Sequence, residues 1–198
     1  MSPVPLFLNG QTDFLKYHGS TQSFLIMAEL IPVLTQNDID TLVAEMARRI
    51  SSDYQDHDLV LIGVLKGAFV FISDLVRHLT IPVKIDFIRV LSYGSGVSSS
   101  RNIQLTKDIE TDIKNKDVLI VEDIVDTGLT IKYLIDYLKT YQPKTVKVCT
   151  LLDKHERREV DVEIDYICHT VTEGFLVGYG LDYDEDFRYL PGVFHFQL

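Results

Sequence analysis

Apolar runs and amphipathic runs alternate along the middle of the chain. Four stretches rich in apolar residues have the length of strands, and the first of them is continuously apolar. They are Leu59–Val64, Val83–Leu91, Asp117–Val121 and Thr145–Leu152. Other stretches carry apolar residues three and four positions apart, a spacing typical of helices that pack on one face. Strands separated by helices indicate right-handed crossovers, so we expect an α/β fold with a parallel sheet flanked by helices.

Three helices are predicted by this spacing. The first carries its apolar residues over 39–50 and has Thr35 in the position of an N-cap. The second spans residues 69–79 and the third residues 131–138, and a proline follows each of these two.

The two ends of the chain lack the alternation of strand and helix. Residues 1–22 show no period and are assigned to an arm, which a short strand over Phe24–Leu34 follows. Near the other end, Ile164–Cys168, Phe175–Tyr179 and Val193–Phe196 predict short strands joined by turns. No internal repeat or linker divides the sequence, so we expect the 198 residues to form a single domain.

The composition excludes some partners. Hydrophobic residues at 46% and charged residues at 24% are ordinary for a soluble globular protein. The net charge of −10 argues against binding of nucleic acid or of an anionic membrane. A local phosphate site is compatible with this charge because screening acts over ~8 Å at physiological salt. Such a site would recruit Mg²⁺ to offset carboxylates and phosphates together.

The sequence does not predict a disulfide, a zinc site or a membrane-targeting segment. Cys149 and Cys168 lie in apolar, strand-like sequence, which is typical of buried thiols without a disulfide. The six histidines lack the spacing of a zinc site. The apolar run Val4–Leu8 is short, contains Pro5 and lacks a basic leader. It predicts neither a signal peptide nor a membrane span, and we expect a cytoplasmic protein.

The segments with unusual chemistry all follow predicted strands. They are Leu65–Gly67, Ser92–Arg101, Glu122–Thr130 and Asp153–Lys154. Because ligands of a parallel sheet bind at the carboxyl ends of its strands, we expect these four segments to share one rim. The Gly/Ser tract from Ser92 predicts a mobile loop or lid, with plain disorder as the alternative.

The stretch Val118–Thr130 joins a buried strand to acids and a turn. Its apolar residues run into Glu122 and Asp123, then Asp126, before Thr-Gly-Leu-Thr opens a helix. Backbone N–H groups and hydroxyls at a helix start bind phosphate without a lysine. The alternatives are a solvated strand end for the acids and a simple helix cap for the hydroxyls.

Together these residues form a pattern that resembles the signature of type I phosphoribosyltransferases. Further segments look like those of the hypoxanthine-guanine phosphoribosyltransferases, and the likeness covers Leu59 to Pro191 in the same order. These segments are Leu65–Gly67, Ser92–Gly94, Leu151–Lys154, Phe175–Tyr183 and Arg188. The resemblance implies a core of about residues 35–160 and a small hood of short strands from about residues 1–34 and 161–198.

The activity implied by the resemblance is a Mg²⁺-dependent transfer of the phosphoribosyl group from phosphoribosyl pyrophosphate (PRPP) to N9 of hypoxanthine or guanine. Glu122 and Asp123 would hold the ribose hydroxyls and a Mg²⁺, and Asp126 would be the general base or hydrogen-bond acceptor near N7 of the purine. The alternative for Asp126 is a cap of the following helix. The turn would cradle the 5′-phosphate with Asp126, Thr127, Gly128, Leu129 and Thr130.

The resemblance assigns pyrophosphate to Leu65, Lys66 and Gly67, with a non-proline cis peptide bond between the first two. Arg188 would complete this anion site as a bidentate donor. The alternatives are an exposed lysine at a helix start and a surface ion pair between Arg188 and a nearby acid.

The purine would contact residues from two other segments. Lys154 would donate to the 6-oxo group, Phe175 would stack on the base and the backbone at Leu176 would read its edge. Asp182, beside the purine, would bind a second Mg²⁺ that bridges to pyrophosphate. The alternatives are a solvated lysine and a core aromatic ring. Tyr93, next to Ser92 on the loop, would close over the reacting centre and exclude water.

The sequence departs from the family's pattern in two places. Before Phe175, Thr170–Gly174 replaces the usual Ile-Pro-Asp type of turn, which leaves the shape of the purine pocket wall open. Leu129 stands where some members have lysine. The 5′-phosphate must then rely on N–H groups, hydroxyls and the helix dipole.

Two rival functions and the state of assembly remain open at the level of sequence. A regulator with the same fold that binds nucleic acid is disfavoured by the acidic charge. Lys154 favours a 6-oxopurine over adenine or orotate, whereas xanthine stays open. The resemblance implies a homodimer or homotetramer, and the apolar residues Phe69–Phe71 and Val193–Phe196 fit either an interface or a core.

Overall fold

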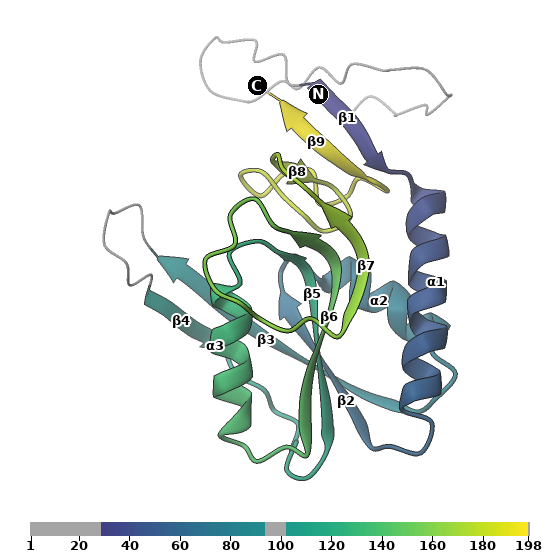
Figure 1. The fold of residues 1–198 in the computed structure, drawn as a ribbon, viewed down its shortest axis with the longest axis vertical. Coiled ribbons are helices and arrows are strands. Elements are labelled where there is room, and N and C mark those ends of the chain that lie inside the picture. The colour runs from purple at the N-terminus through teal and green to yellow at the C-terminus, as the bar shows by residue number, and fades with distance from the viewer. Residues whose placement is uncertain (1–28, 94–101, 198) are drawn as a thin grey trace, which may run out of the picture.

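The structure is a computed structural model that describes residues 29–93 and 102–197. These residues form three helices and two sheets, whose arrangement is shown in Figure 1. The larger sheet has the strand order β4-β3-β2-β5-β6-β7, and the smaller has the order β1-β9-β8. The elements of the larger sheet and its helices are α1 (Gln36–Asp53), β2 (Leu59–Leu65), α2 (Phe69–His78), β3 (Val83–Tyr93), β4 (Asn102–Lys107), β5 (Asp117–Val125), α3 (Leu129–Lys139), β6 (Thr145–Lys154) and β7 (Tyr166–Val171).

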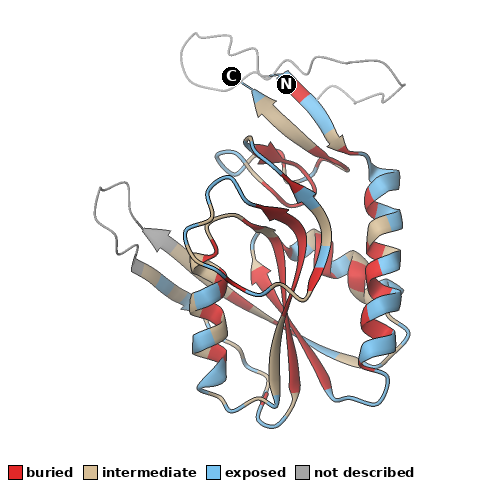
Figure 2. Cartoon of the chain, viewed as in Figure 1, coloured by how far each residue is buried: buried red, intermediate tan, exposed pale blue. Residues whose placement is uncertain are grey.

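The core lies on both faces of the central strands β2 and β5. Successive strand residues point to opposite faces, so Leu59 and Leu61 pack in one cluster while Val60 and Ile62 pack in another. Residues of α1 and α2 complete the first cluster, and residues of α3 complete the second. The neighbouring strands in the row β3-β2-β5-β6-β7 all pair parallel. Figure 2 shows β2 and β5 buried at the centre. The predicted parallel sheet flanked by helices is confirmed.

The helix starts follow from local chemistry. The Thr35 hydroxyl accepts from the Asp38 N–H at 3.2 Å, and the Asp38 carboxylate accepts from the Thr35 N–H at 2.9 Å. This capping box fixes the start of α1 at the predicted residue. Helix α3 begins directly after Gly128, whose φ of 83° suits a residue without a Cβ.

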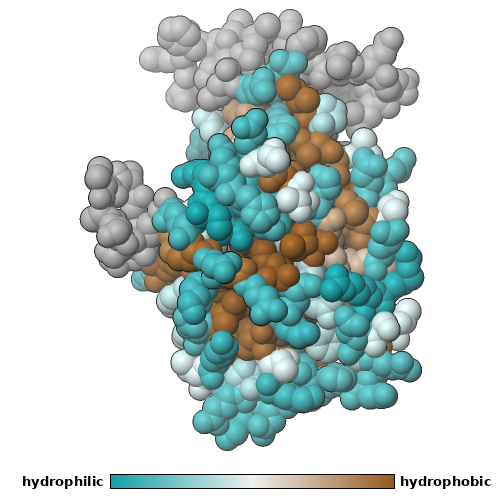
Figure 3. Space-filling model, viewed as in Figure 1, coloured by the Kyte–Doolittle hydropathy of each residue, from teal (hydrophilic) through white to brown (hydrophobic). Residues whose placement is uncertain are grey.

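The small sheet pairs a strand from the N-terminal part of the chain with two strands from the C-terminal part. It contains β1 (Glu29–Leu34), β8 (Leu176–Val177) and β9 (Val193–Gln197), all antiparallel. This arrangement matches the expected hood of short strands. Figure 3 shows apolar side chains at the surface in this region, where Ile31 of β1 is 37% exposed.

Two strands differ from the expectation. β7 belongs to the larger sheet, because it pairs with β6 and buries Tyr166 and Val171 in the core cluster that also contains α1. The sheet core therefore extends beyond the predicted limit near residue 160. β4, which the sequence did not predict, pairs antiparallel with the end of β3.

The Gly/Ser tract begins later than predicted. Ser92 and Tyr93, assigned to a mobile loop, have strand backbone and pair with Ile103 and Asn102. The remainder of that tract lies outside the described residues, as does the predicted arm over residues 1–22.

Two smaller expectations concern the membrane and the thiols. No helix within residues 29–93 and 102–197 has the length and apolar character to cross a membrane. Both cysteines are free, with Cys149 buried and Cys168 partly buried, and burial raises the pKa of each thiol. No disulfide links them, as predicted.

Candidate active site

The acids of the Val118–Thr130 stretch lie inside the strand rather than beyond it. β5 continues to Val125, so Glu122 and Asp123 are strand residues, and their exposed fractions are only 9% and 8%. The alternative of a solvated strand end is therefore wrong. Two adjacent carboxylates without water are costly unless a cation or hydrogen bonds compensate them.

The electrostatics of this pair reflect that cost. Burial raises the pKa of Glu122 well above its usual value, and the neighbouring charge of Asp123 raises it further. Burial likewise raises the pKa of Asp123 to about 6, against the lowering effect of the Ile124 N–H and of Arg188. Glu122 Oε2 is buried and has no hydrogen-bond partner within the described residues. The pair thus has unused capacity for a cation or for hydroxyl donors.

Gly67 brings the pyrophosphate segment against this acidic pair. A Cβ at Gly67 would lie 1.8 Å from Asp123 Oδ2, and a Cβ at Gly180 would lie 2.1 Å from the Gly67 carbonyl oxygen. Only glycines permit this approach of three segments. The peptide bond between Leu65 and Lys66 is cis, as the resemblance predicts.

Arg188 and Lys66 meet the acids of the same region. Arg188 Nη2 lies 2.7 Å from Asp182 Oδ1, and Nη1 donates to the Gly180 carbonyl at 2.7 Å. Lys66 Nζ lies 2.7 Å from Glu185 Oε2, which is also 3.5 Å from Arg188 Nη2. Both cations are therefore held at the rim by carboxylates, and an incoming anion would have to compete with those pairs. Arg188 thus forms ion pairs with Asp182 and Glu185, but its side chain is only 19% exposed, so this is not the surface ion pair of the alternative.

Asp126 and Lys154 face each other across the neighbouring strand ends. Lys154 Nζ is 3.9 Å from Asp126 Oδ1 and 3.3 Å from Glu156 Oε2. Lys154 is only 6% exposed, so the alternative of a solvated lysine is wrong. Asp126 does not cap α3, because the N-cap is Gly128 and no side chain caps the helix. Both predicted functional side chains are therefore positioned at one end of the sheet.

The turn between β5 and α3 is fixed from the side of residues 159–160. The Thr127 carbonyl accepts from the Glu159 N–H at 2.9 Å and from the Val160 N–H at 3.1 Å. A Cβ at Gly128 would approach the Val160 carbonyl to 2.8 Å. The Leu129 N–H lies 3.4 Å from the Thr127 hydroxyl. With Thr130 in the first turn of α3, N–H groups and hydroxyls of this turn lie together at the start of the helix.

Phe175 lies at the surface beside the small sheet. It is 51% exposed, so the alternative of a core aromatic is wrong, whereas Leu176 is 6% exposed. Edge-on rings of Tyr183 and Phe196 lie 5.7 Å and 6.2 Å from it between ring centroids. An exposed aromatic ring of this kind is suited to stack on a planar base.

Arg158, a residue that holds the backbone of the site in place, was not identified from the sequence. Arg158 donates from Nε to the Asp126 carbonyl at 2.9 Å and from Nη2 to the carbonyls of Val125 and Lys154, each at 3.1 Å. It also bonds the buried carboxylate of Asp153. The available signal was an arginine in the loop directly after a rim strand, which the sequence analysis treated as part of a charged segment.

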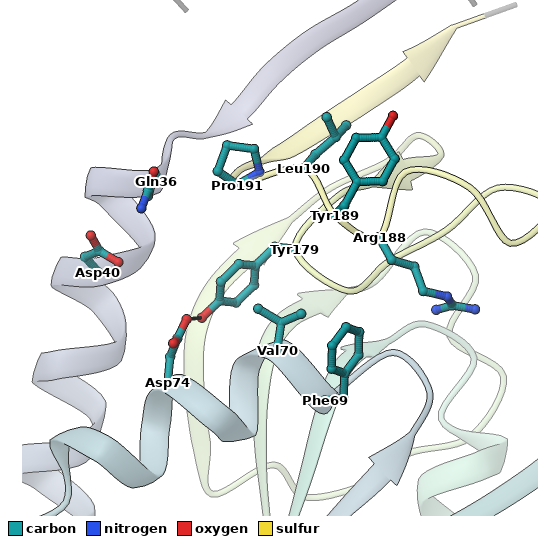
Figure 4. A pocket seen from close by; sticks show the side chains of 10 residues that line it. All are labelled: Gln36, Asp40, Phe69, Val70, Asp74, Tyr179, Arg188, Tyr189, Leu190 and Pro191. Atoms are coloured by element: carbon teal, nitrogen blue, oxygen red, sulfur yellow. Dashed lines mark hydrogen bonds between the residues drawn. The ribbon is translucent and has the colours of Figure 1, made fainter. Parts of the chain in front are cut away.

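A cavity of about 230 Å³ lies beside the pyrophosphate residues and is shown in Figure 4. Its lining comes from α1, α2 and the segment before β9, and includes Val70 and Leu190. The Tyr179 phenol donates to Asp74 at 2.7 Å in this cavity. Exposed Phe69 and Tyr189 complete it, with exposed fractions of 44% and 74%. The cavity is distinct from the acidic pair, because neither acid lines it.

No group of three or more His, Cys, Asp or Glu side chains in the described ranges is arranged to hold a metal by itself. The predicted ligands Glu122, Asp123 and Asp182 would share a bound Mg²⁺ with substrate oxygens or water. That sharing is usual for Mg²⁺ at phosphate sites. The side chains of Ser92 and Tyr93 lie outside what the structure describes.

Comparison with known proteins gives consistent matches. The phosphoribosyl transferase domain family matches residues 33–184. The hypoxanthine phosphoribosyltransferase of Salmonella typhimurium is 42% identical over 163 residues, covering 81% of this chain and 92% of that protein. The hypoxanthine-guanine phosphoribosyltransferase of Streptococcus pyogenes is 44% identical over 159 residues, covering 80% and 88%. A crystal structure of a hypoxanthine phosphoribosyltransferase from Staphylococcus aureus has a TM-score of 0.80 at 40% identity, covering 84% of this chain and 90% of that one.

The chain therefore belongs to the phosphoribosyl transferase family and is a pentosyltransferase enzyme. Within that family, the relatives and structures it resembles are hypoxanthine and hypoxanthine-guanine phosphoribosyltransferases. The family resemblance expected from the sequence is confirmed.

Proposed function

We propose that this chain is a purine-salvage enzyme that transfers the 5-phosphoribosyl group of PRPP to N9 of hypoxanthine or guanine, giving IMP or GMP and pyrophosphate. The relatives support this activity, since they are named for it and their similarity covers about four fifths of this chain. The observation that carries it is the meeting of Asp126 and buried Lys154 at the rim, 3.9 Å apart, next to the acidic pair of β5.

PRPP is bound from two sides in this proposal. The 5′-phosphate lies at the start of α3, where Thr127 to Thr130 supply N–H groups and hydroxyls. Pyrophosphate lies near Gly67 and Arg188, and Lys66 leaves Glu185 to reach it. Glu122 and Asp123 accept hydrogen bonds from the ribose hydroxyls. This role is supported by buried Glu122 Oε2, which has no hydrogen-bond partner within the described residues.

The base is recognised by residues beyond β6 and before β8. The Lys154 ammonium donates to the 6-oxo group, a contact that adenine cannot accept because it carries an amino group there. The exposed ring of Phe175 stacks on the purine, and the backbone at Leu176 reads its edge. Asp126 accepts the proton of the purine or holds its N7 side while N9 attacks C1′ of the ribose.

Mg²⁺ is the proposed cofactor, and the residues present suit it. Buried Glu122 with a free oxygen and its neighbour Asp123 form a carboxylate set for a hard cation, and Asp182 offers a second position. When bound with PRPP, Mg²⁺ neutralises charge on the departing pyrophosphate. Asp182→Ala should raise the Mg²⁺ concentration needed for half-maximal rate severalfold. An unchanged Mg²⁺ titration in this variant would contradict the assignment of Asp182.

We also propose a cytoplasmic homodimer or homotetramer. Exposed Phe69 and Tyr189 at the Figure 4 cavity are large aromatic residues of the kind enriched at subunit contacts. Light scattering of the purified protein should give a mass of two or four chains, and Tyr189→Glu should lower it. A monomer at micromolar concentration would rule the assembly out. Fractionation of the source cells tests the cytoplasmic location.

The activity itself is tested by a spectrophotometric assay with PRPP and Mg²⁺. Hypoxanthine, guanine, xanthine and adenine are assayed in parallel on the same enzyme. We expect turnover of hypoxanthine or guanine and none of adenine. A preference for xanthine would change the proposed acceptor, and absence of turnover with all four bases would refute the activity.

A further inference from the structure

Lys154 has two carboxylate neighbours, of which Glu156 is the nearer. Its Nζ lies 3.3 Å from Glu156 Oε2 and 3.9 Å from Asp126 Oδ1. The side chain of Lys154 is 8% exposed and that of Glu156 is 44% exposed, so the pair lies at the boundary between protein and solvent. If Asp126 serves the reaction, Glu156 is the carboxylate that remains to orient the ammonium throughout turnover.

The same oxygen of Glu156 has a second partner on another segment. The Gly174 N–H donates to Glu156 Oε2 at 3.2 Å. Gly174 directly precedes Phe175, whose carbonyl accepts from the Phe196 N–H at 2.8 Å. Hydrogen bonds from Lys154 and from Gly174 together lower the pKa of Glu156. One carboxylate therefore connects the lysine at the end of β6 with the segment that carries the stacking ring.

This contact lies where the sequence departs from its family. Gly174 has a φ of 95°, and a Cβ there would lie 2.5 Å from His195 Nδ1. The pocket wall thus turns through a left-handed glycine that His195 covers, in place of the Ile-Pro-Asp type of turn. A glycine turn has more conformational freedom than a proline turn, so it needs an added anchor to be equally well defined.

We propose that Glu156 is a positioning residue for the purine site, which fixes the distance between the Lys154 ammonium and the Gly174–Phe175 wall. The proposal rests on the proposed function, in which Lys154 reads the 6-oxo group and Phe175 stacks on the base. Glu156 does not touch the reacting atoms. Its effect is confined to how well the purine is held, whereas the PRPP residues on β2 and β5 do not depend on it.

The test compares Glu156→Ala and Glu156→Gln with Glu173→Gln as a matched control. Glu173 is exposed and lies one residue from Gly174, so its substitution makes the same change of charge on the same surface. Losing a partly exposed ion pair and a backbone hydrogen bond should raise KM for hypoxanthine about 3- to 10-fold in Glu156→Ala. Glu156→Gln, which still accepts from Gly174, should show a smaller rise, and KM for PRPP and the melting temperature should stay unchanged.

The outcomes separate the two levels of the proposal. If the unsubstituted enzyme turns over neither hypoxanthine nor guanine, the proposed function fails. If it is active and Glu156→Ala leaves KM for hypoxanthine unchanged, only the role of Glu156 fails. A parallel rise of KM for PRPP, or an equal change in Glu173→Gln, would show a general structural effect and would also overturn it.

A double-mutant cycle examines the link to Lys154. IMP binding is measured by calorimetry for Glu156→Ala in the native background and in the Lys154→Met background. Because residues that act through one contact are not additive, the substitution should weaken IMP binding less when Lys154 is absent. Equal weakening in both backgrounds would contradict positioning through the lysine.

Discussion

At the scale of single residues, hydrogen bonds fix the backbone of Asp126, whereas one oxygen of its carboxylate is free to accept a hydrogen bond or a proton. Arg158 donates to the carbonyl of Asp126 at 2.9 Å and fixes the chain at that point. Asp126 Oδ1 is buried and has no hydrogen-bond partner within the described residues. Arg157 and Lys154 each lie 3.9 Å from one of its oxygens. A carboxylate with a free oxygen on a fixed backbone is suited to accept a proton from a bound base.

Replacing Asp126 by asparagine should therefore remove the base without disturbing the fold. The amide keeps the size of the carboxylate but accepts no proton, so we expect kcat to fall about 10²- to 10⁴-fold. The melting temperature should be unchanged, because Arg158 bonds the backbone and not the side chain. The measurement is steady-state turnover of hypoxanthine, with exposed Asp161→Asn as the control. Wild-type kcat in Asp126→Asn would remove this residue from the chemistry.

At the scale of elements, the opposite end of β5 has a purely structural role. Asp117, 3% exposed, accepts from Thr145 Oγ1 at 2.6 Å, from His57 Nδ1 at 2.8 Å and from Lys144 Nζ at 3.1 Å. Burial alone would raise the pKa of Asp117, but these hydrogen bonds lower it below its usual value. One carboxylate thus ties the starts of β5 and β6 to the loop before β2.

Asp117→Ala should destabilise the protein by about 1.5–3 kcal/mol, because it removes the buried carboxylate that accepts hydrogen bonds from Thr145, His57 and Lys144. Urea unfolding measures this loss. The kcat of the folded fraction should stay unchanged, since the active site lies at the other end of the sheet. Lys144→Ala removes only an exposed partner and should cost less than about 1 kcal/mol. Equal losses in the two variants would contradict a central role for Asp117.

The elements themselves were predictable to different degrees. Helix α1 could be predicted to its first residue, because Thr35 and Asp38 form a local capping box. β4 was missed because its pairing with β3 is a contact between segments, and six mixed residues carry little periodic signal. β7 was assigned to the hood for a related reason, since no helix pattern precedes it and only its pairing with β6 reveals the sheet to which it belongs.

At the scale of the whole molecule, the fold brings the active-site residues together. Gly67, Asp123 and Gly180 come from separate segments, yet each would clash with the next if a glycine carried a side chain. The signature in β5 made the positions of the acids and of the turn before α3 predictable. The ion pairs of Lys66 with Glu185 and of Lys154 with Glu156 were not, because the first depends on tertiary geometry and the second on side-chain direction at a strand end.

The buried carboxylates brought together at this site destabilise the protein when no ligand is bound. Burial raises the pKa of Asp123 to about 6, so between its ordinary value of 3.8 and 6 the folded state binds a proton that the unfolded state has released. Stability conferred by this group is therefore present at low pH and is lost as the pH rises through about 6. Above that pH, the buried negative charge opposes folding until a cation or substrate compensates it.

Asp123→Asn should consequently stabilise the metal-free protein at pH 7.5 while abolishing its activity. Asparagine can still accept from the Ile124 N–H, a bond that measures 2.9 Å to Asp123, and it removes repulsion with Glu122. We expect a gain of about 2 kcal/mol at pH 7.5 that vanishes near pH 4, as measured by urea unfolding in chelator. The control is the same pair of proteins with PRPP and Mg²⁺, where the native enzyme should recover the difference. A variant that is less stable than the native protein at pH 7.5 would mean that the Asp123 carboxylate supports the fold rather than straining it.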